Sequence, residues 1–357
     1  MQYDPGRPED VIIERAVDVL SGGGIIAFPT DTVYGLGCRA DASAAVKRIY
    51  RIKGRDRNKP LILMIRGAAS LPDLTAEMPA AARFLIEQFW PGPLTIIFKA
   101  SGKVREWKLS KGGTIGIRRT AEPAVQRILA RLFVPLATTS ANPSGSPESF
   151  SALDVARNLR RPVDLILDGG FLAARAPSTV LDVTGETPVV LRKGAVPRSE
   201  LEQALGAPVK LNAVDVMFVC TGNTCRSPMA EGYFRKIMPR EWKDRVTVHS
   251  SGTGALPGMP ATGTAVAVAR RGRFGIESHW ATLLTDRLIR QADLIVAMEE
   301  QHCQAIRGLA PEARPALLAP DGVPDPIGGE IADYQLTMDI IMRRMPDVLA
   351  LIREMIA

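Results

Sequence analysis

One short segment near residue 220 restricts the fold of this 357-residue chain more than any other feature. An apolar run ends at Cys220, five residues form a loop to Arg226, and a helix-forming stretch follows with Pro228 in its first turn. Proline is tolerated there, so the segment predicts a strand, a loop and a helix in that order. Such a loop is long enough to turn its backbone N–H groups inward around a phosphate, and the helix N-terminus adds positive potential at the same place.

The residue types in this loop indicate nucleophilic chemistry on phosphorus. The inward N–H groups and the helix N-terminus stabilise negative charge, so they are expected to lower the pKa of the Cys220 thiol. The thiolate that results is the form that attacks phosphorus. Arg226 offers a planar pair of donors for phosphoryl oxygens. Gly222 and Asn223 suit the left-handed backbone that a tight loop requires. The alternative interpretation is a strand–turn–helix that carries a buried cysteine without chemistry.

The two halves of the chain differ in how strands and helices follow one another. After residue 211, strand-like and helix-like stretches alternate, which predicts a parallel sheet covered by helices on both faces. Ligands in such folds bind beyond the carboxyl ends of the strands. Before it, the pattern indicates a mixed arrangement of strands and helices. We therefore predict an α/β protein of two domains, 1–210 with a mixed α/β sheet and 211–357 with a doubly wound parallel sheet.

Composition says more about the expected cellular compartment and partners of the chain than about its function. The four cysteines do not form a disulfide framework, and no apolar run approaches the ~18 residues of a membrane span, so a cytoplasmic protein without a membrane partner is expected. The formal charge of +7 suits anionic partners such as ATP, phosphorylated proteins or RNA. Neither His279 nor His302 has a visible partner, and both are expected to be structural.

The C-terminal half resembles the low-molecular-weight protein phosphatases over about residues 213–357. The resemblance includes the segment around Cys220 and the motif Asp325-Pro326-Ile327-Gly328 on a distant loop. It implies a nucleophile, a phosphoryl-binding guanidinium, a thiolate donor, a residue that holds the loop, and a general acid that later activates water against a phosphocysteine. In that order these residues are Cys220, Arg226, Ser227, Asn223 and Asp325.

The same resemblance bears on regulation and specificity. Cys225 could form a reversible disulfide with Cys220, or could simply pack. Tyrosine-directed members carry a bulky aliphatic residue where this chain has Thr224, so the loop is more similar to that of bacterial protein-arginine phosphatases. Ile327 departs from the aromatic residue expected in both groups, and phosphoarginine is only narrowly preferred over phosphotyrosine as the protein substrate. Arsenate reductase is the alternative chemistry; it needs a further mobile cysteine, for which Cys303 on a helix is a poor candidate.

The N-terminal half has no Walker-type phosphate loop, so a nucleotide site there must be built otherwise. Instead, turn-forming residues combine with hydroxyl or basic groups at the ends of predicted strands, as in loops that bind an anionic nucleotide. Each cluster alone is a weak signal, since basic runs are usually solvated surface. The clusters are PTDTVYGLG (29–37), KGRDRNKPL (53–61), WPGPLT (90–95), SANPSG (140–145), STVLD (178–182) and LRKG (191–194).

In this order and spacing the clusters resemble the threonylcarbamoyl-AMP synthase family, with its YrdC-like fold, over about residues 8–200. That family joins L-threonine, bicarbonate and ATP, and its product enters the tRNA-modification machinery. The resemblance implies that the triphosphate is held by Lys53, Arg55 and Lys59. It implies that the nucleotide site is completed by Ser140, Asn142, Ser149 and Arg192. It implies that threonine is held by Thr32, Arg118 and Ser178.

Two further expectations concern this half. Mg²⁺ is expected to bridge the phosphates of ATP, and no cluster of metal-ligating side chains is predicted. Some relatives have histidine where this chain has Met64, so one threonine contact is expected to be absent. The alternative is that this half is only an RNA-binding module with a concave basic face.

Overall fold

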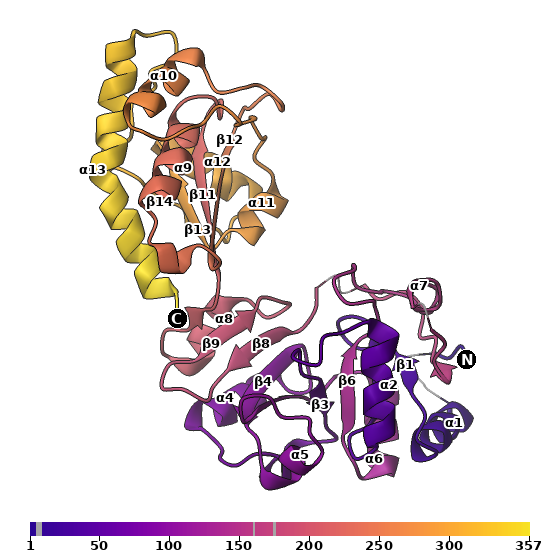
Figure 1. Ribbon diagram of the computed structural model, residues 1–357. Helices are drawn as coiled ribbons and strands as arrows, with labels where there is room; N and C mark the ends of the chain where they lie inside the picture. Colours follow the sequence, from indigo (N-terminus) through magenta and orange to yellow (C-terminus); the bar gives the residue numbers. More distant parts are fainter. Residues whose placement is uncertain (5–8, 160, 174–175) are drawn as a thin grey trace. The chain divides into compact units, whose positions relative to one another are not determined.

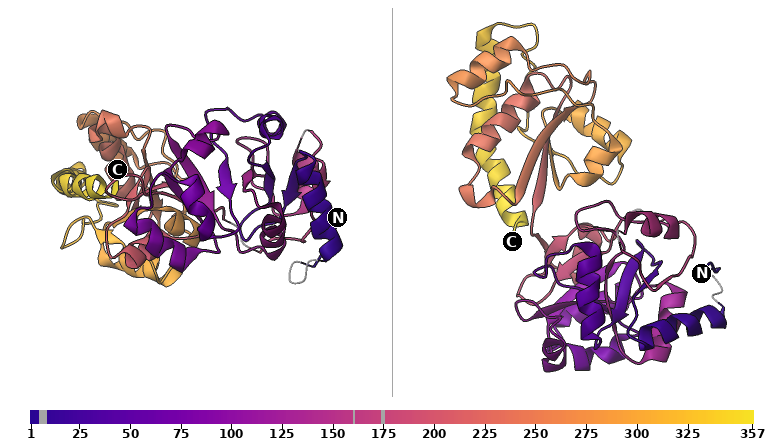
Figure 2. Two further views of the ribbon diagram at one scale, coloured as in Figure 1. Left: turned by 90° about the horizontal axis from the view of Figure 1, so that it is seen from below. Right: turned by 45° about the vertical axis from the view of Figure 1, so that its right-hand side comes forward.

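The computed structural model describes residues 1–4, 9–159, 161–173 and 176–357 (Figures 1 and 2). The chain divides into two compact units, Met1–Lys210 and Leu211–Ala357. Each unit combines helices with a sheet of its own, so the predicted α/β class is confirmed. No helix among the described residues is long and apolar enough to cross a membrane.

A mixed sheet of ten strands forms the centre of the first unit, in the order β10-β9-β8-β4-β5-β3-β6-β2-β1-β7. β3 pairs with β5 in parallel and with β6 antiparallel, as the predicted mixed sheet requires. The strands are β1 (Ile26–Phe28), β2 (Gly35–Arg39), β3 (Ile62–Met64), β4 (Leu94–Lys99), β5 (Thr114–Arg118), β6 (Leu136–Ser140), β7 (Leu165–Ile166), β8 (Thr179–Asp182), β9 (Val189–Arg192) and β10 (Lys210–Leu211).

Helices of the first unit bury apolar stripes against this sheet. In α1, the buried residues Ile13, Ala16 and Leu20 recur at the three- and four-residue spacing of one helix face, and they share a core cluster with Ile128 of α6 and Phe28 of β1. The helices are α1 (Asp10–Ser21), α2 (Ser43–Lys53), η1 (Ala68–Ser70), α3 (Leu71–Leu74), α4 (Ala80–Phe89), α5 (Gly102–Glu106), α6 (Pro123–Leu132), α7 (Ala152–Asn158) and α8 (Arg198–Leu205).

A four-stranded sheet in the order β12-β11-β13-β14 forms the centre of the second unit, and its neighbouring strands are all parallel. Successive residues of β11 face opposite sides: Met217 joins a core cluster with Ile306 of α12, whereas Phe218 packs on Phe234 of α9 with ring centroids 6.0 Å apart. Both faces are therefore covered, as predicted. The elements are β11 (Val214–Cys220), α9 (Arg226–Ile237), η2 (Arg240–Trp242), β12 (Val246–Gly252), α10 (Gly263–Arg271), α11 (Asp286–Gln291), β13 (Leu294–Ala297), α12 (Glu300–Leu309), β14 (Ala316–Leu317) and α13 (Ile331–Met355).

The strand order places β11 at the point where the chain changes direction across the sheet. The strand that follows it in sequence, β12, lies on one side of β11, and β13 lies on the other. Ligands in open parallel sheets bind beyond the carboxyl end of a strand at such a point. That end of β11 is Cys220.

Candidate active sites

The loop after β11 holds the Cys220 sulfur among polar donors. The backbone N–H of Asn223 donates to Sγ at 3.3 Å, and the Ser227 hydroxyl lies 2.9 Å from it. Asn223 Nδ2 donates to the same hydroxyl oxygen at 2.9 Å, so the Ser227 proton is available for Sγ or for the Ser251 carbonyl at 3.4 Å.

Burial works against these donors. Burial raises the pKa of the Cys220 thiol, while the Ser227 hydroxyl, backbone N–H groups and the Arg226 charge lower it. Burial is the largest of these effects, so the pKa of Cys220 is raised and not lowered as expected from the sequence. Ionisation of the thiol therefore depends on each remaining donor.

Asn223 fixes the shape of the loop. Its backbone is left-handed, with φ of +53°, as its residue type predicted. Its side chain is fully buried: Nδ2 also donates to Ser250 Oγ at 2.9 Å, and Oδ1 accepts from the Thr282 N–H at 2.7 Å. Its carbonyl lies 2.7 Å from Nε2 of His279, so that histidine braces the loop.

Arg226 begins α9, and its guanidinium contacts groups from two other segments of the unit. Its side chain is 1% exposed; Nη1 donates to the Val323 carbonyl at 2.9 Å and to the Glu299 carboxylate, and Nη2 donates to Asp325 Oδ2 at 2.5 Å. Two carboxylates therefore balance the guanidinium charge.

A cavity of about 170 Å³ opens over these groups. Thr224 and Ile327 line it, and Ile327 is 60% exposed. Cys225 also lines it, with Sγ 3.4 Å from the Thr262 hydroxyl and 3.5 Å from the Tyr334 hydroxyl. The remaining lining residues are Cys220, Thr221, Gly222, Arg226 and Asp325.

The first unit contains a second cavity, of about 280 Å³, over the central strands of its sheet. Its wall combines apolar side chains with hydroxyl and guanidinium groups. The residues predicted from the sequence that line it are Thr32, Arg55, Arg118, Ser140, Ser178 and Arg192, and Met64 also lines it.

Arg118 is fixed at one side of this cavity. It is 4% exposed; Nε donates to the Gly92 carbonyl at 3.0 Å, Nη1 to Thr32 Oγ1 at 2.9 Å, and Nη2 to Asp31 Oδ1 at 2.7 Å. The second oxygen of Asp31 is buried without a partner among the described residues. The clusters 29–37 and 90–95 thus meet on one guanidinium.

Ser178 and Arg192 form another wall. Arg192 Nη2 donates to the Ser178 carbonyl at 2.8 Å and to its hydroxyl at 3.0 Å, and that hydroxyl lies 2.9 Å from Thr95 Oγ1. Gly194 allows the approach, because an added Cβ would lie 2.4 Å from backbone atoms of Pro177, Ser178 and Thr179.

Comparison with known proteins identifies the first unit. Residues 18–194 match the family model Sua5_yciO_yrdC, described as telomere recombination. A putative threonylcarbamoyl-AMP synthase from Mycobacterium tuberculosis (strain ATCC 25618 / H37Rv) is 36% identical over 195 residues, which are 54% of this chain and 89% of that protein. The chain belongs to the Sua5/YciO/YrdC family. The solved structure of Escherichia coli YciO is 32% identical, with a TM-score of 0.52 over 57% of this chain and 98% of that chain.

The second unit is similar to another family of proteins. Residues 215–356 match the family model of the low molecular weight phosphotyrosine protein phosphatases.

A further relative matches the first unit over only part of its own length. The threonylcarbamoyl-AMP synthase of Pyrococcus abyssi (strain GE5 / Orsay) is 39% identical over 202 residues, but the match covers 56% of this chain and only 59% of that protein. The chain thus spans less than two thirds of this curated relative.

Within the Sua5/YciO/YrdC unit, other predicted residues lie outside the cavity lining. Lys53 is 3% exposed, and Nζ donates to the Ser140 carbonyl at 2.5 Å and to Asn142 Oδ1 at 3.1 Å. Burial, and then the Arg55 charge, lower the pKa of Lys53 to about 8. Ser149 is buried on the Ala141 carbonyl, and the Lys59 side chain is exposed.

The sequence patterns missed Glu148, which lines the same cavity. Its Oε2 atom is buried and has no hydrogen-bond partner within the described ranges, although Lys53, Arg55 and Arg192 feel its charge. A lone glutamate in the loop after SANPSG gives no periodic or motif signal, so only the fold reveals it.

In the second unit the sequence patterns missed Glu299 and showed no partner for His302. Glu299 is the N-cap of α12, and His302 returns the contact in a capping box. His302 Nε2 also lies 2.9 Å from Thr221 Oγ1 in the loop. The acidic residue before the helix was the available signal, but it marks a cap rather than a site.

Proposed function

We propose that the chain is a bifunctional enzyme. The first unit forms threonylcarbamoyl-AMP from L-threonine, bicarbonate and ATP for tRNA modification, and the second hydrolyses a protein phosphoarginine or phosphotyrosine through a phosphocysteine. Two observations support the proposal: hydroxyl and guanidinium groups from all six sequence clusters converge on one cavity, and Cys220, Arg226 and Asp325 converge on the other.

In the first unit, Arg118 would bind the carboxylate of threonine beside the Thr32 hydroxyl. Its donors are already fixed by backbone and side-chain acceptors, so little entropy is lost when the ligand binds. Arg55 and Arg192, which line the same cavity, would hold the phosphates and stabilise charge as pyrophosphate leaves.

The residues present fit a divalent cation on the triphosphate. Glu148 offers a buried carboxylate oxygen that has no hydrogen-bond partner among the described residues, and Mg²⁺ is commonly held by one or two carboxylates together with substrate phosphates. Glu148 would be its protein ligand. When bound, the ion would neutralise phosphate charge at the reacting centre.

The test of the first unit is pyrophosphate release from ATP by the full chain. Release should require both L-threonine and bicarbonate, and Arg118→Lys should raise the KM for threonine at least tenfold by replacing a planar fork with a point charge. Pyrophosphate release that does not depend on threonine would rule out this synthase function. RNA binding without any pyrophosphate release would instead support the alternative that this unit is only an RNA-binding module.

In the second unit, Cys220 Sγ would attack phosphorus while the bond from phosphorus to the leaving atom breaks. Arg226 would exchange its carboxylate partners for two phosphoryl oxygens. Asp325, paired with Arg226 Nη2 at 2.5 Å, would leave this ion pair, accept the proton of the Cys220 thiol and give it to the leaving atom. In the second step Asp325 would take a proton from water, whose oxygen attacks the phosphocysteine and releases phosphate and the Cys220 thiolate.

Phosphoarginine is the preferred substrate. Thr224 gives the cavity a small polar wall suited to a guanidinium-bearing phosphate, which narrowly favours phosphoarginine, whereas the exposed Ile327 offers no aromatic stacking surface to either substrate. The deciding experiment compares kcat/KM for phosphoarginine and phosphotyrosine, with Cys220→Ser as the blank. A tenfold preference, about 1.4 kcal/mol, decides the class. No turnover above the blank would refute the phosphatase assignment; arsenate reduction is disfavoured because Cys303 is buried in a core cluster.

A further inference from the structure

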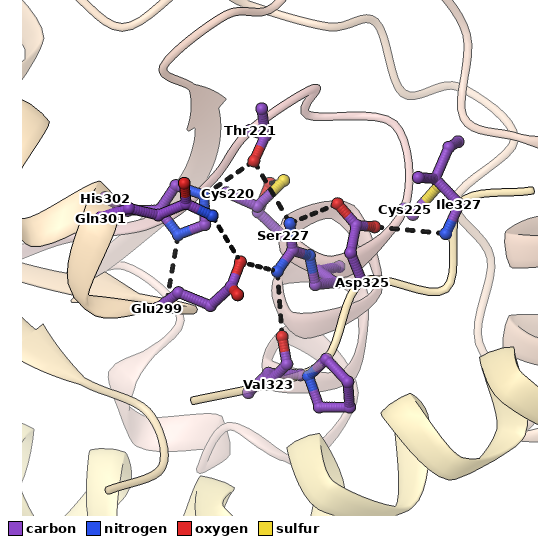
Figure 3. Close-up of polar contacts among 12 residues, drawn as sticks. Cys220, Thr221, Cys225, Ser227, Glu299, Gln301, His302, Val323, Asp325 and Ile327 are labelled. Carbon is purple, nitrogen blue, oxygen red and sulfur yellow. Dashed lines mark hydrogen bonds and ion pairs between the residues drawn. The ribbon is translucent and has the colours of Figure 1, made fainter. Parts of the chain in front are cut away.

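We propose that Thr221 is a further substrate-contacting residue of the phosphatase unit, whose hydroxyl donates a hydrogen bond to the phosphoryl group, and that His302 is the positioning residue that directs this hydroxyl. The inference rests on the proposed phosphatase function and adds one contact to it. Thr221 follows the nucleophile and lines the same cavity, and Figure 3 shows its side chain beside Cys220 with a contact to His302.

The tautomer of His302 sets the direction of this contact. The backbone N–H of Glu299 donates to Nδ1 at 3.1 Å, so Nδ1 carries a lone pair rather than a proton. His302 is 1% exposed, and burial, and then the Arg226 charge, lower its pKa. The ring is therefore neutral with its proton on Nε2, and Nε2–H donates to Thr221 Oγ1 at 2.9 Å.

Thr221 Oγ1 accepts a second hydrogen bond, from Arg226 Nη2 at 3.3 Å. A hydroxyl has two acceptor lone pairs and one proton, so both lone pairs are used and the proton points away from both donors. No acceptor for it lies among the residues that the structure describes. Since Thr221 is exposed on the cavity, an anionic phosphoryl oxygen is the acceptor that this arrangement fits.

The contact is built to remain when substrate arrives. A phosphoryl group that binds Arg226 must displace the carboxylates of Glu299 and Asp325. These two side chains are then free to move. His302 instead holds Thr221 through a neutral ring, which is itself fixed by a backbone N–H at the start of α12. A donor oriented before the reaction costs no reorganisation during it.

The test uses the full chain and compares Thr221→Val, Thr221→Ser and the matched control Thr247→Val, which changes an exposed residue of β12. Affinity for orthovanadate, kcat/KM for phosphoarginine and phosphotyrosine, and the thermal midpoint are measured. Thr221→Val should lose roughly tenfold to hundredfold in vanadate affinity and in kcat/KM for whichever substrates are turned over, the range of a hydrogen bond to a charged group. Thr221→Ser should stay within about threefold of the parent chain, because the hydroxyl is kept.

His302→Ala tests the positioning role. Alone it should lower vanadate affinity less than Thr221→Val does, and in the Thr221→Val background it should cause no further loss. Full additivity, or unchanged vanadate affinity in folded Thr221→Val, would overturn the inference. A loss confined to one substrate, with vanadate binding intact, would also overturn it. If the parent chain turns over neither substrate, the proposed function fails, while vanadate binding still decides the role of Thr221.

Discussion

At the scale of single residues, the Ser227 hydroxyl is one of the groups that set the reactivity of Cys220. Ser227 donates to Sγ at 2.9 Å and lowers the pKa of a thiol that burial raises. Ser227→Ala should therefore raise the pKa, reduce the thiolate fraction at neutral pH and slow alkylation by iodoacetamide roughly tenfold at pH 7. The rate should recover as pH rises, because the thiol then ionises without the donor.

The measurement is the pH profile of Cys220 alkylation, with the Cys220→Ser rate subtracted. Ser278→Ala, an exposed site in the same unit, is the matched control and should keep the parent profile. An unshifted profile in Ser227→Ala would show that the hydroxyl donates elsewhere, for which the Ser251 carbonyl at 3.4 Å is the nearest choice.

Glu148 supports a second prediction at this scale. If its unpartnered oxygen binds the divalent cation, Glu148→Gln should leave ATP affinity without Mg²⁺ unchanged or improved, since a negative charge is removed beside Arg55 and Arg192. The gain in affinity on adding Mg²⁺ should fall at least tenfold. Calorimetric titration of ATP with and without Mg²⁺ measures both, and Glu186→Gln, exposed in a loop, is the control. An undiminished Mg²⁺ effect would exclude Glu148 as the ligand.

At the scale of elements, the segment at the end of β9 positions Arg192 at the proposed ATP site. Gly194 lets this segment approach the backbone at Ser178, and that approach brings Arg192 onto the Ser178 carbonyl and hydroxyl. Gly194→Ala should push the segment away and weaken ATP binding about tenfold or more. Gly185→Ala, where the nearest atom lies 4.0 Å from the added Cβ, should bind ATP normally. Equal affinities in the two variants would show that the approach is not needed.

Elements also mark how far the sequence could predict this structure. A strand, loop and helix around Cys220 and the parallel sheet behind them followed from apolar runs and turn residues, and the structure confirms that fold class. The segment 207–213 has no strong periodicity, yet it contains β10, because pairing with distant strands decides such short strands. Glu299 and His302 were missed for a related reason, since only the packing of α12 brings its N-terminus to the loop.

At the scale of the whole molecule, the two proposed chemistries differ in what carries positive charge. The synthase unit is proposed to need a divalent cation beside Glu148, whereas the phosphatase unit is proposed to use Arg226 and the Cys220 thiolate. In the described parts of the chain, no group of three or more His, Cys, Asp or Glu side chains could hold a metal by itself. The other ligands of the cation would come from the phosphates of ATP and from water.

Chelation should accordingly separate the activities on one polypeptide. Excess EDTA should lower threonine-dependent pyrophosphate release by at least a hundredfold and leave phosphatase turnover within about twofold, since charge neutralisation by the ion is worth several kcal/mol to one reaction only. Cys220→Ser should show the opposite pattern, with pyrophosphate release kept and phosphatase turnover abolished. Both assays use the full chain in one buffer, and Mg²⁺ added back in excess is the control. Phosphatase activity that also fails with EDTA and returns with Mg²⁺ would contradict the cysteine mechanism, because a thiolate and a guanidinium need no exchangeable ion to attack and hold phosphorus.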